Sequence, residues 1–257
     1  MNNDPLLSCW IKIDRANKHL NDLIKAMEAF QHRYTQDFVA DEESEPTIKI
    51  YRVRILEDIP ANLSGYIGDV VHNLRSALDC LAVALIKRVD PTVGDDVLRD
   101  TYFPIAWDES GLSNERRTRF FNRVGAPVEK LIRRVQPYRG GKGHVLWQLE
   151  HLDITDKHRQ IIPGLLNVSH ITFYVMQPVN GNPISRPKYE PPFPLKDGDE
   201  ICRVAFSEPN YNSSVHFQLE IAFNEPPFVV AKPVAITLKQ FVYFVHRLID
   251  IFREQFF

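Results

Sequence analysis

Residues 62–88 read NLSGYIGDVVHNLRSALDCLAVALIKR, a stretch with a helical pattern of apolar residues. Pro60 precedes it and Pro91 and Gly94 follow it, so helix start and stop signals stand on both sides. At roughly 100° per residue, the apolar side chains fall on one side of a helical wheel. They are Leu63, Ile67, Val70, Leu74, Ala77, Leu78, Leu81 and Leu85. The stretch therefore predicts one long helix whose apolar face lies in the core.

The opposite side of this helix is polar, within an arc of about 120° by the same arithmetic. Gly65 and Gly68 lie along this polar arc and leave room for another backbone or a ligand. The arc is poor in Lys and Glu, the usual residues of a solvated helix face. Three interpretations stay open: a solvated outer face, a hydrogen-bond network between packed helices, or a ligand or catalytic site. The polar side chains of the arc are Asp69, His72, Arg75, Ser76 and Asp79.

The rest of the chain alternates helical and strand patterns. The last three predicted strands are short and bounded by turn residues, so we expect them to form one antiparallel sheet. Further helices are predicted at residues 6–34, 113–123, 127–135, 144–162 and 237–256, and strands at 47–56, 171–176, 200–206 and 214–223, with a proline-rich loop at 178–194.

We therefore predict the α+β class, with long amphipathic helices packed with a small antiparallel sheet. The simplest organisation is a single domain over residues 1–257. In that domain a helical part extends to about residue 165, and the sheet and a C-terminal helix follow from about residue 166.

Composition and charge are those of an ordinary globular protein. The chain has 44% hydrophobic and 25% charged residues and a net charge of −2, which gives no global indication of a nucleic-acid or acidic-membrane partner. No stretch approaches eighteen uncharged apolar residues, and MNNDPLLSCW lacks the pattern of a signal peptide, so we expect a cytoplasmic protein without a membrane partner. The separated Cys9, Cys80 and Cys202 predict reduced thiols.

Three histidines follow one another at steps of seven residues on the helix predicted at 144–162. Because each such step rises about 10 Å, no two of them can bind the same ion from this helix alone. The chain also has no HExxH and no CxxC, so we expect no zinc, no iron and no cofactor. The helix can instead pack on the polar arc. His144, His151 and His158 share its face, and Asp153, Asp156, His158 and Arg159 would then meet Asp69, His72, Arg75 and Asp79.

Three segments of the sequence carry a resemblance. They are GDVVHNLRSALDCLA at 68–82, the helical stretch from Trp10 to Leu23, and LDITDKHR at 152–159. Together they resemble an uncharacterised bacterial protein family with a GDxVHNLRSALD helix motif and a later LDxxDKHR segment. The match extends over most of the first 160 residues.

The usual form of that motif continues to a histidine. This gives Arg-x4-His, which is similar to the motif of HEPN-type ribonucleases. That resemblance implies metal-independent RNA cleavage by an arginine and a histidine on one helix. Here Arg75 is present, but Cys80 stands at the position of the histidine. A thiol is a poor substitute for an imidazole in proton transfer near pH 7.

Residues 114–144 carry a local excess of positive charge. Only Glu115 and Glu129 offset it, and Phe120, Phe121 and Tyr138 are interleaved. Such a segment suits a polyanion, with aromatic rings available for stacking. The alternative is two amphipathic helices with basic outer faces. The basic residues are Arg116, Arg117, Arg119, Arg123, Lys130, Arg133, Arg134, Arg139 and Lys142.

These patterns favour a nucleic-acid-directed protein, either RNA-binding or similar to a metal-independent ribonuclease. The basic segment would hold the backbone of the nucleic acid or another polyanion. On the polar arc, Arg75 would neutralise a phosphate, His72 would transfer a proton, and Asp69 or Asp79 would orient it, with His158 as a further candidate. The alternative is a non-enzymatic binding or structural module whose polar arc is an interhelical network. The sequence leaves open whether the protein is an enzyme and whether it forms a homo-oligomer.

Overall fold

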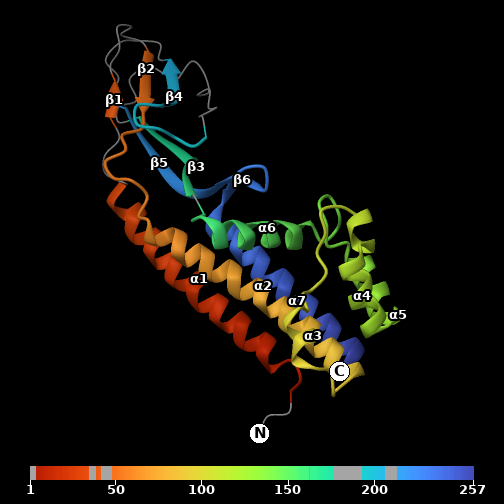
Figure 1. The fold of residues 1–257 in the computed structure, drawn as a ribbon. Helices are drawn as coiled ribbons and strands as arrows, with labels where there is room; N and C mark the ends of the chain where they lie inside the picture. Colours follow the sequence, from red (N-terminus) through yellow and green to blue (C-terminus); the bar gives the residue numbers. More distant parts are fainter. Residues whose placement is uncertain (1–3, 35–38, 42–47, 162, 176–192, 206–212) are drawn as a thin grey trace. The chain divides into compact units, whose positions relative to one another are not determined.

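The computed structural model describes residues 4–34, 39–41, 48–161, 163–175, 193–205 and 213–257 (Figure 1). Its helices are α1 (Leu7–Tyr34), α2 (Asn62–Val89), α3 (Asp95–Arg99), α4 (Glu115–Val124), α5 (Ala126–Val135), α6 (His144–His158) and α7 (Val234–Phe256), with a 3-10 turn at Ser110–Ser113. Its strands are β1 (Val39–Asp41), β2 (Ile48–Arg52), β3 (Pro163–Val175), β4 (Glu200–Ala205), β5 (Ser213–Glu225) and β6 (Val229–Pro233). The predicted α+β class is confirmed. Most of the loop predicted at 178–194 lies outside the described residues.

The contacts of the chain divide it into two compact units. The helical unit comprises Met1–Leu23, Ser64–Ile161 and Ala235–Phe257. The sheet unit comprises Ile24–Leu63 and Ile162–Val234. Almost all of α7 therefore belongs with the other helices, whereas the sequence pattern grouped it with the strands. The single domain stays a prediction.

Helix α2 supplies much of the core of the helical unit. Its bounds agree with the predicted 62–88 to within one residue, and every apolar side chain predicted for its core face is buried. Burying one such Leu or Ile side chain contributes about 1.5–3 kcal/mol. Helices α1 and α7 lie beside it (Figure 1), with the Trp10 and His246 rings 5.2 Å apart and Arg88 5.5 Å from the Phe256 ring.

A short break separates α4 from α5 and changes the direction of the chain (Figure 1). The side chain of Asn114 caps α4 by accepting a hydrogen bond from the backbone N–H of Arg117, 3.0 Å away. Gly125 ends α4 at a φ of 86°, a value that favours glycine. Pro127 stands in the first turn of α5, where its missing N–H costs nothing. The basic segment is therefore split between two helices.

The described strands form two antiparallel sheets, in the orders β1-β2-β4 and β3-β5-β6. The prediction that strands 171–176, 200–206 and 214–223 share one sheet was wrong, because β4 pairs with β2. Ile50 lies opposite Arg203, and the backbone N–H of Gly198 continues the pairing by donating to Val53 O at 2.9 Å. Alternation within a strand does not identify a partner so far away in the chain. Strand β6, which was not predicted, pairs with β5.

Helix α6 is shorter than the predicted 144–162. It ends at His158, and Arg159 already has extended backbone, with φ −160° and ψ 160°. Strand β3 then begins at Pro163, eight residues before the predicted strand. Within the described ranges, no helix has both the length and the apolar character needed to cross a membrane.

Candidate binding site

Helix α6 covers the middle of the polar arc of α2. Three pairs of residues meet there, and their numbers rise along α2 as they fall along α6, so the two helices run antiparallel through this contact. The prediction that the arc faces another helix is confirmed for this part. The pairs are Gly68 with Asp156, His72 with Asp153, and Arg75 with Glu150.

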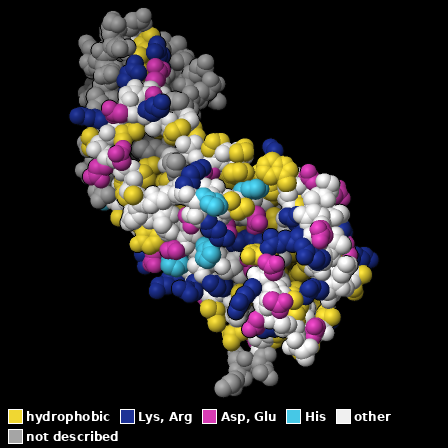
Figure 2. All heavy atoms as spheres, viewed as in Figure 1, with side chains coloured by type: hydrophobic (Ala, Val, Ile, Leu, Met, Phe, Trp, Pro, Cys, Tyr) yellow, Lys and Arg dark blue, Asp and Glu magenta, His cyan; other side chains and the backbone are white. Residues whose placement is uncertain are grey.

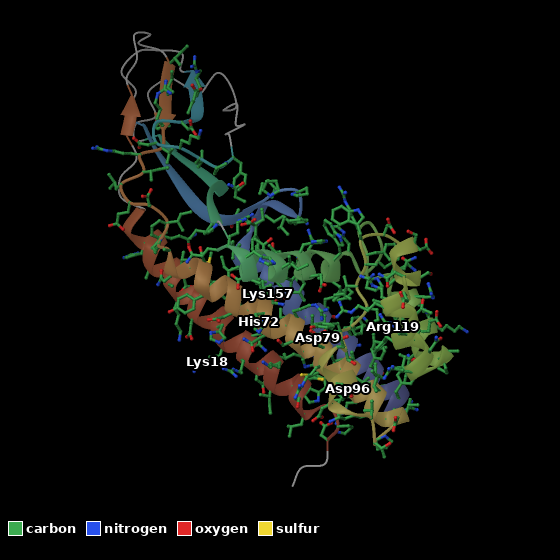
Figure 3. The ribbon with its side chains drawn as sticks, in the orientation of Figure 1. Lys18, His72, Asp79, Asp96, Arg119 and Lys157 are labelled. Carbon is green, nitrogen blue, oxygen red and sulfur yellow. The ribbon has the colours of Figure 1, made fainter. Side chains whose placement is uncertain are left out.

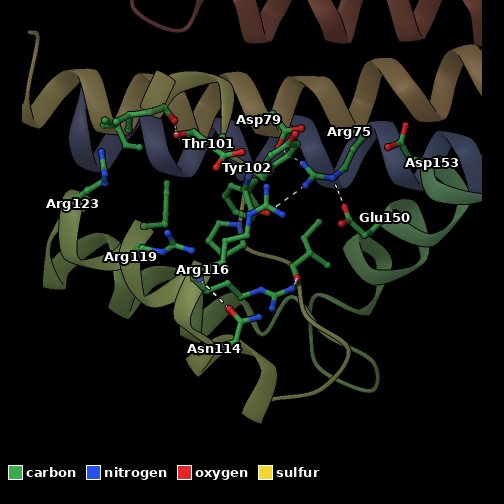
Figure 4. Close-up of a pocket in the computed structure, with 18 of the residues that line it drawn as sticks. Arg75, Asp79, Thr101, Tyr102, Asn114, Arg116, Arg119, Arg123, Glu150 and Asp153 are labelled. Atoms are coloured by element: carbon green, nitrogen blue, oxygen red, sulfur yellow. Dashed lines mark hydrogen bonds and ion pairs between the residues drawn. The ribbon is translucent and has the colours of Figure 1, made fainter. Parts of the chain in front are cut away.

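Arg75 is buried at the centre of this contact, with 5% of its surface exposed. Its guanidinium donates to the carboxylates of Asp79 and Glu150 and to Phe103 O (Figure 4). Burial opposes the charge of Arg75, but the two carboxylates outweigh it and raise the pKa of the guanidinium. Asp79 also accepts from the Phe103 N–H at 2.9 Å. These side chains join α2, α6 and the segment after α3.

His72 lies at the edge of the same contact, and 53% of its side chain is exposed. Its Nδ1 is 3.1 Å from Asp153 Oδ1, and its Nε2 is 3.5 Å from Ser76 Oγ. Asp153 is almost fully buried and also accepts from Lys157 Nζ at 2.5 Å. His72 and Lys157 therefore stand on either side of one carboxylate (Figure 3).

The remaining predicted catalytic residues lie elsewhere on the helices. Asp69 is exposed over 57% of its side chain, and its carboxylate is 3.5 Å from His19 Nδ1. His158 is exposed on the last turn of α6. Of the five predicted catalytic residues, Arg75 and Asp79 line the cavity described next, whereas Asp69, His72 and His158 do not.

A cavity of about 610 Å³ lies between α2, α3, α4, α6 and the segment from Thr101 to Ile105 (Figure 4). Six basic and five acidic side chains line it, so its lining is strongly polar with a small excess of positive charge. The basic side chains are Arg75, Arg116, Arg117, Arg119, Arg123 and Lys157, and the acidic ones are Asp79, Asp96, Asp100, Glu150 and Asp153.

Helix α4 forms the basic wall of this cavity. Arg116, Arg119 and Arg123 follow one another at steps of three and four residues, which places them on one face of the helix. The Arg116 guanidinium lies 4.3 Å from the Tyr102 ring centroid. Arg119 reaches Glu115 only at 3.9 Å, and both side chains are exposed, so that ion pair is weak. Lys and Arg side chains gather between α6 and α4 on the face drawn in Figure 2.

Arg117 serves a different purpose from the other arginines of α4. Its guanidinium donates to Gly111 O at 3.0 Å and to Ile105 O. It therefore holds the segment after Phe103 against α4. The other predicted nucleic-acid-binding residues, Arg133, Arg134 and Lys142, do not line the cavity.

Sequence reasoning missed Tyr102, Glu150 and Lys157, which all line the cavity. Glu150 and Lys157 each read as an ordinary surface charge of a helix. Only the partner that each one meets distinguishes it, and partners come from the fold. Tyr102 precedes the tripeptide Phe103–Ile105, and that position was the one signal that could have drawn attention to it.

The thiols of the helical unit are not activated for nucleophilic chemistry. Burial raises the pKa of Cys80, and burial also raises that of Cys9, to about 12. Among the described residues, no group of three His, Cys, Asp or Glu side chains is placed to hold a metal ion. Comparison with protein-family models, curated proteins and solved structures gave no match.

Proposed function

We propose that the protein binds nucleic acid, with a phosphate of the ligand held in the cavity by Arg116, Arg119 and Arg123. The observation that carries this proposal is the row of three guanidiniums on one face of α4, open to a 610 Å³ cavity. Arginine suits phosphate because its planar guanidinium can donate two parallel hydrogen bonds. The volume lies within the usual range of about 300–1,000 Å³ for small-molecule sites.

The acidic side of the cavity supports a nucleotide over a simple inorganic anion. Asp96 and Asp100 line it from α3 and the residue that follows α3. Carboxylates accept hydrogen bonds, and a nucleotide offers donors in its ribose hydroxyls and exocyclic amines. A phosphate on α4 and a sugar or base toward α3 would match the two sides of the lining.

Arg75 supports this site without contacting the ligand. Its donors already serve Asp79, Glu150 and Phe103 O. This arrangement favours the interhelical network that the sequence left as the alternative for the polar arc. The proposal therefore joins a structural polar arc with a binding site on the basic segment.

The test is binding of a fluorescently labelled single-stranded RNA, measured by anisotropy over a series of salt concentrations. We expect the triple variant Arg116→Gln, Arg119→Gln, Arg123→Gln to bind more weakly. The slope of log Kd against log salt should fall by about 2, since each lost phosphate contact on a single strand removes about 0.7.

A matched control removes the same charge away from the cavity. The triple variant Lys130→Gln, Arg134→Gln, Lys239→Gln changes three exposed positions outside the lining. It should retain nearly the wild-type affinity and slope. Equal losses in both triple variants, or no RNA binding by the wild type, would overturn the proposal.

A ribonuclease activity is a second candidate, and the pairing of His72 with Asp153 favours it. A carboxylate beside one ring nitrogen orients an imidazole for proton transfer through the other. Incubation of the same RNA with wild-type protein and with His72→Ala, in the presence of EDTA, tests this candidate. Cleavage by the wild type alone would support it, and intact RNA in both samples would remove it.

A further inference from the structure

A cluster of aromatic rings lies beside the cavity, and the proposed function does not use it. Trp107, Trp147 and His151 meet edge to face, with ring centroids 4.7–5.3 Å apart. The ring of His144 stacks on Trp147 at 5.1 Å and 20°. We call these four residues the aromatic platform. Such pairs fix ring orientation, because edge-to-face and offset contacts are the favoured geometries.

Trp107 is the accessible member of the aromatic platform. It is 49% exposed, whereas Trp147 is 1% exposed. The guanidinium of Arg139 lies 5.6 Å from the Trp107 ring centroid and 5.7 Å from that of Trp147. A large exposed aromatic side chain held by other rings and accompanied by a cation has the composition of a nucleobase-stacking site.

The backbone around Trp107 is held in place by the glycine-rich turn. The Arg139 N–H donates to Trp107 O at 3.1 Å, and the Ala106 N–H donates to Pro137 O at 2.9 Å. A side chain at position 141 would place its Cβ 2.4 Å from Gln136 O, so this close approach requires Gly141. Trp107 is thus held on an ordered backbone that needs no rearrangement before binding.

The aromatic platform is continuous with the cavity at two points. Along the chain, Ile105 lines the cavity and Trp107 follows two residues later, at most about 7 Å away in an extended chain. On α6, Glu150 lines the cavity and the next residue, His151, belongs to the platform. One bound strand can therefore reach both sites.

The ionisation of His151 suits a stacking surface. Burial lowers the pKa of its imidazole, and nearby Glu150 only partly opposes this. The ring is therefore neutral near pH 7. Positive charge beside the platform comes from Arg139 and the exposed Lys142 on the turn.

We infer that the ligand is a single-stranded nucleic acid, with an unpaired base stacked on Trp107 while the backbone follows Arg139 and the arginines of α4. This inference rests on the proposed function and names its substrate class. In a duplex the bases are stacked on one another and their faces are covered, so the platform would select against it.

The test compares three labelled ligands of equal length: a single-stranded oligouridine, the duplex that it forms with oligoadenosine, and an abasic strand with the same phosphates. We expect the single strand to bind wild-type protein about 5- to 100-fold more tightly than the abasic strand, the range for one or more stacked bases. The duplex should bind more weakly than the single strand.

Substitutions at Trp107 separate stacking from phosphate binding. Trp107→Ala should lose about 10-fold in affinity for the single strand and nothing for the abasic strand, with an unchanged salt dependence. Trp107→Phe should retain most of the affinity, which guards against a folding defect. Tyr243→Ala, at an aromatic residue 69% exposed on α7, is the matched control and should bind like the wild type.

The outcomes separate this inference from the proposed function. If the abasic strand or the duplex binds as tightly as the single strand, or if Trp107→Ala binds like the wild type, the aromatic platform has no such role. The cavity proposal then stands or falls with its own arginine variants. If those variants bind normally while Trp107→Ala loses affinity, the platform stands and the cavity proposal fails.

Discussion

Asp156 is a carboxylate held in an unfavourable place. A Cβ at position 68 would lie 2.3–2.5 Å from its carboxyl atoms, so only glycine on α2 leaves room for it. Burial raises the pKa of Asp156, and the neighbouring carboxylates of Asp153 and Asp69 raise it further. The charged form of this side chain therefore costs the folded protein stability at neutral pH.

We expect Asp156→Asn to raise the Tm at pH 7 by roughly 2 °C, a small change for a chain of this size. Because the folded-state pKa is raised, the acid group contributes stability at low pH that is lost as pH rises through that value. The advantage of Asn should therefore shrink as pH falls toward the ordinary Asp value of 3.8. Thermal melts of both proteins at a series of pH values measure it.

The control for this prediction is Asp14→Asn, the same substitution at an exposed position of α1. Its Tm should follow that of the wild type at every pH. A lower Tm for Asp156→Asn at pH 7 would mean that the carboxylate has a favourable partner that outweighs its burial.

At the scale of elements, one buried arginine connects α2 with α6. Arg75 is 6% exposed on its side chain, and each of its carboxylate partners, Asp79 and Glu150, is 26% exposed. Removing the cation would leave two partly buried carboxylates facing each other without a positive charge. Such an uncompensated charge is more costly than the loss of a surface ion pair.

Arg75→Met should therefore lower the free energy of unfolding by about 2–4 kcal/mol. The triple variant Arg75→Met, Asp79→Asn, Glu150→Gln should recover most of that loss, because it leaves no unpaired charge. Urea denaturation measures both effects. Arg119→Met, which removes an exposed and weakly paired arginine, should change stability by less than about 0.5 kcal/mol. A small loss for Arg75→Met would show that the network carries little energy.

Local periodicity was sufficient to predict the helices. The bounds of α2 follow from apolar spacing and flanking prolines, which act within a few residues of the position they determine. The pairing of β4 with β2 could not be predicted in this way, because it depends on residues far apart in the chain. The predicted end of α6 was wrong for a related reason, since Arg159 adopts extended backbone ahead of β3.

The candidate site was predictable in its parts but not in its assembly. The spacing of residues identified the polar arc of α2 and the basic residues of α4. It did not reveal that Arg75 is occupied by Glu150, because that contact joins residues on separate helices. Nor did it separate Arg116, which lines the cavity, from Arg134 on α5, because the turn at Gly125 redirects the chain between them.

On the scale of the whole molecule, the helical unit is assembled from three separate stretches of chain. The last of them supports the cavity wall. Phe252 on α7 is fully buried, and its ring meets that of Phe103 edge to face at 6.1 Å. Phe103 lines the cavity and accepts a hydrogen bond from Arg75. A change near the C-terminal end of the chain should therefore be felt at the binding site.

Phe252→Ala should cost about 3–5 kcal/mol of stability, the usual range for emptying a buried phenylalanine position. Because Phe103 loses its support, affinity for RNA should also fall under conditions where the variant is still folded. Phe252→Leu, which keeps more of the volume, should retain most of both properties. Urea denaturation and anisotropy on the same samples measure them. Normal affinity in a destabilised but folded Phe252→Ala protein would separate the wall from α7.

The three-stretch construction also determines when the protein can fold as it is made. Helix α1 emerges early from the ribosome, but its partner α7 follows more than two hundred residues later. At about 5–20 residues per second, Trp10 waits on the order of 10 to 50 seconds for the residue it stacks on, His246. During that time the apolar stripe of α1 lacks its final cover. A nascent chain stalled before α7 should therefore recruit chaperones at α1, and release of the complete chain should end that association.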